Sequence, residues 1–561
     1  MSSPSQIAGR PAKTTGLGYW MHQVLKEGQH VSADFSADAV HDLRVALRRC
    51  RSMADGLRAL DPIPEWKAMK KAGRQLFQRL GALRDVQVMM EWIEELEPAE
   101  ANVQGAGVEQ GSVKQAGTER ALPSPGSAQA LPAFSSPQEE TPKNAEPGLA
   151  AQPGALRDPV AEALNKILAE REKEQKREAR SALEEFDHKQ WKNWADTLPP
   201  RAAHIRPGSP LFKHLALERW TEAHALHTRA LRNRSQVALH TLRIAIKRFR
   251  YIVENFLPVE HQAWSKDLKE IQDSLGEIHD LDVLWATALS CRVFPDATSR
   301  NRWQARILAE RNKRIAHYRE KMVGPNSLWQ VWRAGLPQGK QIQALATRRM
   351  KLWASSLDPD FAHSERVAKL SLELYDGLTR AGFFASGVTD SSNGTGRSSL
   401  QIAALLHDVG KSKGNKGHHK ASLDLIKSHE TPLGYKNEDM RRAAIVARFH
   451  CGALPTRSHK ALRDLLPGEQ KLTIQLAAVL RLANALDAEH DGHIRRVLVE
   501  KQRANGGRMP HPGCVVLDAE GYSARNHTAR NVAAERHLLE TVLRRPVMIK
   551  AMKNQAARIR P

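Results

Sequence analysis

The sequence predicts a mainly α-helical protein with a small β element near its C-terminal end. Three observations lead to this fold class. Apolar residues recur at spacings of three and four, as in Leu76, Leu80 and Leu83, which is the period of an amphipathic helix. A basic segment with helical periodicity occurs twice in similar form, as HDLRVALRRCR at 41–51 and HTLRIAIKRFR at 240–250. The chain has 561 residues, too many for one hydrophobic core, so two to four domains are expected.

Changes in composition and in apolar periodicity divide the chain into domains. Residues 1–16 and a Gly-, Pro- and Ser-rich insertion at about 99–156 keep no helical period, so both are expected to be disordered. The rest of a first domain at 17–322 has the apolar spacing of helices. A short break at 323–340 is interpreted as a linker, and a second helical domain occupies 341–561.

The β element is expected near the end of that second domain. IRRVLVE (494–500) and CVVLD (514–518) are β-branched runs bounded by Gly and Pro, which is typical of short strands. A final helix is predicted around TARNVAAERHLLETVL (528–543).

The composition favours an anionic partner. The chain carries 85 Lys and Arg against 62 Asp and Glu, a net charge of +23, and a field of this sign attracts polyanions. Four widely spaced cysteines without a CxxC pair suit a reducing cytoplasm, and neither a signal peptide nor an apolar run of membrane-spanning length is evident. We therefore expect a cytoplasmic protein without a membrane partner; charge alone does not choose among polyphosphate, nucleic acid and anionic lipid.

The repeated stretch presents one basic face. Residues at i, i+3, i+7 and i+10 share a side of a helix, and in both copies these positions are basic: His41, Arg44, Arg48 and Arg51, and His240, Arg243, Lys247 and Arg250. A second basic row follows in each copy, formed by Lys71 and Arg74 and by Lys266 and Lys269. After it, each copy has a predicted helix that contains the motif Leu-Gly-x-x-x-Asp. The aspartate of the motif is Asp85 in the first copy and Asp280 in the second. Two motifs in the same order indicate an internal duplication.

The ligand of these rows is predicted to have charge but no bases. A solvated basic face is the simpler interpretation of one such run, but here the charges persist between copies while the apolar side chains change. Unpaired Arg and Lys repel one another unless an anion lies among them, and Arg suits phosphate oxygens. The rows contain no Tyr or Trp on which nucleobases would stack, so nucleic acid fits less well.

The two eleven-residue stretches, each followed by the Leu-Gly…Asp helix, resemble the conserved-histidine α-helical domain, CHAD. The resemblance covers about residues 17–320. It implies a duplicated four-helix bundle that binds inorganic polyphosphate through the histidines and basic residues named above. A cytoplasmic protein of this kind is expected to associate with polyphosphate granules. The long insertion departs from a compact member of this family.

The second domain contains a candidate metal site. The apolar helix LQIAALL ends in His407 and Asp408, His363 opens another helix, and Asp487 follows the helix LAAVLRLANAL. Imidazole and carboxylate ligands together suit a divalent cation such as Mn, Mg, Fe or Zn. Three further residues are candidates for catalysis. Lys411 could contact a phosphate, and His419 and His450 could act as additional donors. In contrast, His418, His429 and His459 are expected to be ordinary core or surface residues.

This H…HD…D pattern resembles the HD phosphohydrolase superfamily. More narrowly, the segments HSERVAKLSLELYDGL, AALLHDVGKSKGNKGHHKAS, ARFHCGALP and LRLANALD are similar to the C-terminal HD region of the exopolyphosphatase and guanosine-pentaphosphate phosphohydrolase (Ppx/GppA) family. The main phosphatase site of that family lies in an actin-like ATPase-fold domain, for which this sequence has no counterpart.

Three hypotheses follow. The protein is a metal-dependent phosphohydrolase acting on polyphosphate or a phosphorylated nucleotide, or it is a non-catalytic polyphosphate-binding scaffold with a regulatory HD domain. The third is a nucleic-acid-binding protein. The sequence leaves the metal, the substrate and the oligomeric state open.

Overall fold

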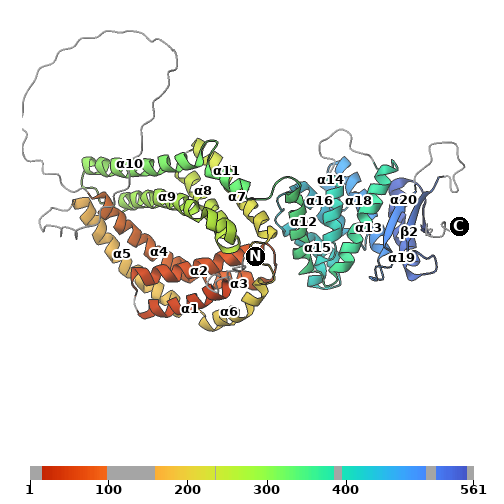
Figure 1. The fold of residues 1–561 in the computed structure, drawn as a ribbon, viewed down its shortest axis with the longest axis horizontal. Helices are drawn as coiled ribbons and strands as arrows, with labels where there is room; N and C mark the ends of the chain where they lie inside the picture. The colour runs from red at the N-terminus through yellow and green to blue at the C-terminus, as the bar shows by residue number, and fades with distance from the viewer. Residues whose placement is uncertain are drawn as a thin grey trace, which may run out of the picture.

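The computed structural model describes residues 16–33, 35–97, 158–233, 235–384, 395–500 and 513–552. The expected insertion at 99–156 and the expected disordered N-terminus, apart from Gly16, lie outside this range. Figure 1 shows a first lobe with the helices up to α11 and a second lobe with the later helices and the sheet. Among the described helices, none is both long and apolar enough to cross a membrane.

The first lobe contains two copies of one helical unit. The first copy is formed by α1 (Leu17–Ala33), α2 (Ala37–Arg58), α3 (Pro64–Ala72), α4 (Arg74–Leu96), α5 (Pro159–Glu184) and α6 (His188–Ala202). The second copy is formed by α7 (Pro210–Asn233), α8 (Gln236–Phe256), α9 (Pro258–Ser290), α10 (Ala297–Met322) and α11 (Leu328–Ala334). The pairs α1–α2, α4–α5 and α1–α6 pack together, as do α7–α8, α9–α10 and α7–α11.

The two eleven-residue stretches lie in α2 and α8, and both helices begin in the same way. Ser36 precedes α2 and its side chain accepts a hydrogen bond from the Ala39 amide; Ser235 precedes α8 and accepts one from Ala238. A serine at this position satisfies an amide that would otherwise lack a partner inside the helix. The duplication therefore extends to the N-terminal cap.

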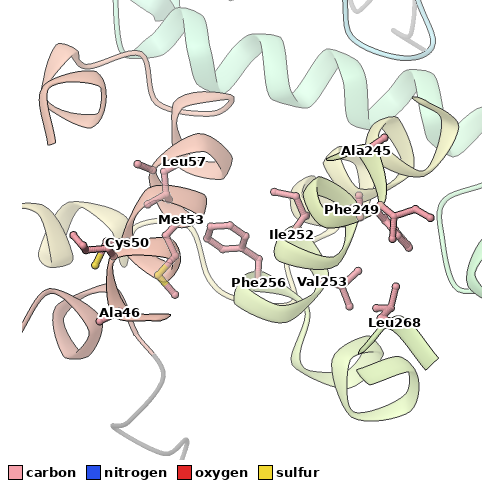
Figure 2. Packing of buried hydrophobic residues seen from close by; sticks show 14 of the residues in the cluster. Ala46, Cys50, Met53, Leu57, Ala245, Phe249, Ile252, Val253, Phe256 and Leu268 are labelled. Carbon is pink, nitrogen blue, oxygen red and sulfur yellow. The ribbon is translucent and has the colours of Figure 1, made fainter. Parts of the chain in front are cut away.

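The two copies share one core, since α2 and α8 pack against each other. Figure 2 shows the buried faces of both helices, with Phe256 from α8 directed toward Met53 on α2. A Cβ atom at Gly56 would collide with the Phe256 ring, so glycine permits this close approach. The apolar stripe predicted from the sequence is the stripe that the structure buries: Leu43, Leu47, Cys50, Leu242, Ile246 and Phe249 are each fully buried.

The expected linker at 323–340 contains α11, and this helix belongs to the core of the first lobe. Trp329 and Trp332 are at most 1% exposed and pack with Trp220, His227 and Phe249. The short length of the apolar pattern hid this helix from the sequence analysis. The second copy of the duplicated unit therefore continues beyond residue 322.

The second lobe is helical with a sheet at its end. Its helices are α12 (Lys340–Ser355), α13 (Phe361–Arg380), α14 (Thr395–Leu406), the 3-10 turn η1 (Val409–Lys413), α15 (His418–Ser428), α16 (Asn437–Arg448), α17 (Lys460–Arg463), α18 (Pro467–Leu486), α19 (His527–Glu535) and α20 (His537–Leu543). Helices α14 and α16 pack against each other and against α18, which is the most deeply buried part of this lobe.

The small sheet has three strands in the order β1 (Arg496–Val499), β2 (Val515–Glu520) and β3 (Val547–Ala551). The first pair is antiparallel and the second is parallel. The two expected strands are thus present, whereas β3 was not predicted. The expected final helix is two helices, α19 and α20, which meet at Arg536.

The lobes are joined by a buried polar contact as well as by the chain. Arg349 of α12 donates to His214 at 3.0 Å and lies 2.6 Å from the Glu218 carboxylate, both on α7. Leu433, in the loop after α15, donates its amide to Glu218 and accepts from His214 through its carbonyl, at 2.9 Å and 2.8 Å. His214 is fully buried and Arg349 is 6% exposed, so these bonds hold the second lobe against α7.

Candidate functional site

The basic rows of the two copies converge where α2 meets α8. Arg44 and Arg48 from α2 are electrostatic neighbours of Lys247 from α8, and Lys247 lies beside Arg243 in the same helix. We call these four residues the central basic cluster. None of their side chains forms an ion pair or a hydrogen bond with another residue in the part of the chain that the structure describes.

Buried guanidinium atoms in this cluster lack partners. The Nε atoms of Arg48 and Arg243 are shielded from solvent and have no hydrogen-bond acceptor. A buried donor without an acceptor costs about 1–3 kcal/mol, more when it is charged. An anion with several oxygens would remove this cost.

The glycines of the Leu-Gly-x-x-x-Asp motif lie beside the cluster. A Cβ atom at Gly81 in α4 would be 3.9 Å from Arg44 Nη2, and one at Gly276 in α9 would be 4.0 Å from Arg243 Nε, which are ordinary van der Waals contacts. One turn later, Asp85 and Asp280 place a carboxylate near the cluster. Each copy therefore lays the same glycine against the same arginine.

The pKa values in the cluster reflect crowding of like charges. Burial, followed by the neighbouring Arg243 and Arg48, lowers the pKa of Lys247 to about 8. Burial raises the pKa of Asp280 to about 6, although Arg243 opposes this shift. A negative charge placed beside Lys247 would raise its pKa again.

The remaining predicted phosphate-binding residues lie around the cluster rather than in it. Arg51 donates to the Lys70 carbonyl at 2.7 Å, and Arg250 lies 3.8 Å from Glu254. His240 contacts His279, with 3.3 Å between the two Nδ1 atoms. The exposed members of the set are His41, Lys71, Arg74, Lys266 and Lys269.

In the second lobe, His363, His407 and Asp408 come together as the sequence analysis expected. Their ligand atoms lie within 4.8 Å of one another, and all three side chains are buried. His363 comes from α13, and His407 and Asp408 from the turn after α14. A Cβ atom at Gly410 would overlap the His418 carbonyl, so this glycine lets η1 and α15 approach closely.

A second cluster shares Asp408 with the first. It consists of His418, His450 and Cys451, whose ligand atoms also lie within 4.8 Å of one another. The Oδ1 atom of Asp408 is 3.3 Å from His418 Nε2 and 3.5 Å from His450 Nε2. Asp408 therefore lies between the two clusters.

Three histidines present the same nitrogen to Asp408. The Nδ1 atoms of His407, His418 and His450 each bond the backbone carbonyl three residues earlier, at 2.8, 2.8 and 2.7 Å. A carbonyl only accepts, so each Nδ1 carries the proton and each Nε2 has a free lone pair. Such a fixed tautomer is how metal-binding histidines are held.

The arrangement fits a divalent cation. The Nε2 atoms of His418 and His450 are 3.1 Å apart with lone pairs on both, a contact that needs a proton or a cation to be favourable. Ligands bound to a cation at about 2.1 Å are separated by roughly 3.0–3.4 Å, which matches this spacing. His407 Nε2 and Asp408 Oδ1 are buried without hydrogen-bond partners. Burial by itself would raise the pKa of Asp408, but nearby positive charge, including that of Lys411 at 2.6 Å, lowers it below its usual range.

Asp487 has other partners. It bonds His363 Nδ1 at 2.7 Å and receives the Arg366 guanidinium at 2.8 Å, while His363 Nε2 contacts the Asn484 side-chain oxygen at 2.9 Å. The structure thus places Asp487 behind His363, as a residue that orients it. Lys411 lies 2.6 Å from Asp408, and His419 lies 3.6 Å from the Cys451 sulfur.

Sequence reasoning missed His418, Cys451 and Arg366. His418 was expected to be an ordinary residue, because nothing in the pattern distinguishes it from His419 beside it. Only the path of α15 decides which of the two faces Asp408. Arg366 follows His363 by three residues and so lies on the same face of α13, a spacing that could have predicted its proximity to Asp487.

The fold and site thus define a protein with a duplicated basic helical lobe and a histidine-rich helical lobe. In the family comparison, residues 19–289 match the CHAD domain and residues 348–508 match the Ppx/GppA phosphatase, domain III. The chain is therefore a fusion of a CHAD domain with a Ppx/GppA domain III, as the sequence analysis expected, and these domains support a polyphosphate-related protein. No curated protein matches the chain.

Proposed function

We propose that the protein binds inorganic polyphosphate at the central basic cluster and hydrolyses a phosphorylated substrate at the Asp408 site. Binding is supported by one observation above all: Arg48 and Arg243, from the two copies, both have buried Nε donors without acceptors. A phosphate chain supplies oxygens in a repeating line and no bases, which suits the convergence of two basic helices.

Hydrolysis is supported by the shared carboxylate. His363, His407 and Asp408 would hold one divalent cation, and His418, His450 and Cys451, with Asp408, a second. A divalent cation polarises a phosphoryl oxygen and lowers the pKa of water. The chain contributes the fixed histidine tautomers and Lys411, whose charge keeps Asp408 ionised.

The test is phosphate release from polyphosphate and from guanosine polyphosphates, with and without added Mn, by the wild type and by Asp408→Ala. We expect release that depends on the cation and falls at least a hundredfold in the variant, while polyphosphate binding is retained. Asp424→Ala, which removes an exposed carboxylate from the neighbouring α15, is the matched control. Equal release by wild type and Asp408→Ala would refute hydrolysis at this site.

A second candidate function, a non-catalytic polyphosphate-binding scaffold, is favoured by the engagement of Asp487 with Arg366 and of both His363 nitrogens. In that case the wild type binds polyphosphate tightly and releases no phosphate with any of Mn, Mg, Fe or Zn. Competition with single-stranded DNA tests the third hypothesis: equal displacement of polyphosphate by DNA would favour a nucleic-acid ligand.

A further inference from the structure

We propose that the second lobe carries an additional binding pocket for a phosphorylated ligand with a planar ring, the chemistry of a nucleotide. It lies outside the central basic cluster and outside the residues that would hold a cation. The proposal therefore goes beyond the proposed function and does not depend on hydrolysis.

The pocket is a cavity of about 330 Å³ between α15, α16 and the segment around α17. This size lies at the lower end of the range of small-molecule sites. Its apolar wall consists of Leu423, Ile445, Phe449 and Ala461, and its polar wall of Lys427, Arg441, Arg448, His459, Lys460 and Asp464.

The polar wall has four cationic side chains against one carboxylate. Within the described residues, none of the four forms an ion pair, and Asp464 instead lies 4.0 Å from Arg463 outside the pocket. The Nη1 atom of Arg448 is shielded from solvent and has no hydrogen-bond partner. Unpaired cations around a cavity repel one another, and an oxyanion among them would remove both the repulsion and the unsatisfied donor.

His459 adds a donor of defined direction. Its Nδ1 atom accepts a hydrogen bond from the Thr456 amide at 3.1 Å. An amide only donates, so in the neutral ring the proton is on Nε2, which is then a hydrogen-bond donor. The imidazole can therefore bind an anion without having to be charged.

The apolar wall distinguishes a ring-bearing ligand from a plain phosphate chain. The Arg448 guanidinium lies over the Phe449 ring, 5.3 Å from its centroid, and the His459 ring meets Phe449 edge-on at 5.2 Å. A planar guanidinium beside an aromatic ring is a group on which a base can stack. Leu423, Ile445 and Ala461 have no favourable contact to offer phosphate, but they cover the edge of a ring.

The pocket adjoins the shared-carboxylate site. Phe449 is followed directly in the chain by His450 and Cys451. Burial lowers the pKa of His419, and the positive charge of Arg448 lowers it further. Arg448 is therefore an electrostatic neighbour of His419, which contacts Cys451.

The test uses the full chain with Arg44→Ser and Arg243→Ser, which removes the competing phosphate site, in EDTA, which removes divalent cations. A fluorescent ATP analogue is titrated and then displaced by ATP or by inorganic tripolyphosphate. We expect one saturable site, displacement by ATP, and at least tenfold weaker displacement by tripolyphosphate.

Arg441→Ser together with Lys460→Ser should weaken binding at least tenfold, since both cations line the pocket and are exposed enough to be replaced without unfolding. Lys436→Ser with Lys471→Ser removes the same charge from exposed positions outside the pocket and should change little. Unchanged thermal unfolding shows that each variant is folded. No saturable binding, equal affinity in the two double variants, or equal displacement by tripolyphosphate would each overturn the proposal. None of these outcomes bears on polyphosphate binding at the central basic cluster.

Discussion

Replacing Arg243 with glutamine tests whether the central basic cluster is the phosphate site. The change removes a cation whose Nε donor is buried and unpartnered, beside Lys247 and near Arg48. A hydrogen bond to a charged group contributes about 1.5–3 kcal/mol. Since 1.4 kcal/mol corresponds to a tenfold change in affinity, we expect Kd for polyphosphate to rise roughly 10- to 150-fold.

The assay is titration of polyphosphate of defined length at pH 7.5 and at several salt concentrations. The wild type should bind more weakly as salt rises, and the Arg243→Gln variant should show a shallower dependence because one fewer cation meets the chain. Arg248→Gln is the matched control, since Arg248 lies in the same helix but is exposed and paired with Glu222. If the Arg243 and Arg248 variants bind alike, the cluster is not the binding site and the duplication needs another explanation.

Four further predictions concern pH, metal and the contact between the lobes. Lys247, with a pKa of about 8, loses its charge as pH rises, so polyphosphate affinity should fall between pH 7 and 9, and Lys247→Arg should remove that fall in the same titration. Asp280, with a pKa of about 6, loses its negative charge as pH falls, so affinity should rise again below pH 6, and Asp280→Asn should abolish this rise. Asp408→Asn should lower the content of bound divalent metal, measured by elemental analysis of the purified protein, whereas Asp424→Asn should leave it unchanged; equal metal in both would contradict the shared-carboxylate site. Arg349→Ala removes the cation paired with Glu218 and the donor to His214, which then keep only their bonds to Leu433. It should destabilise the contact between the lobes by about 3 kcal/mol, measured by urea unfolding against exposed Arg348→Ala; equal unfolding midpoints would show that this contact contributes little.

Much of the first lobe could be predicted because its signal is periodic and repeated. The spacing of Leu43, Leu47 and Cys50 specified which face of α2 is buried, and the second copy confirmed the same face in α8. The glycine and aspartate of the second motif were found by alignment of the copies, but their role was not. Only the packing of α4 against α2 shows that Gly81 lies beside Arg44.

The second lobe was less predictable, because its site depends on which way single side chains point. His363, His407 and Asp408 were found from the pattern, whereas the choice between the adjacent His418 and His419 was not. The helix α11 was missed because it is too short for a period to be recognised, and β3 because VMIKA lacks the β-branched run that marks the other two strands.

The sequence by itself determined the helical class, the duplication, the basic rows and the residues that could bind a cation, because these depend on local spacing and composition. The tertiary structure decided which of those residues share a site. Arg44 and Arg48 meet Lys247 because α2 packs against α8, in a close approach that Gly56 permits, and Asp408 lies beside His418 where Gly410 lets α15 approach η1. Long-range packing sets these distances, and no local pattern in the chain encodes them.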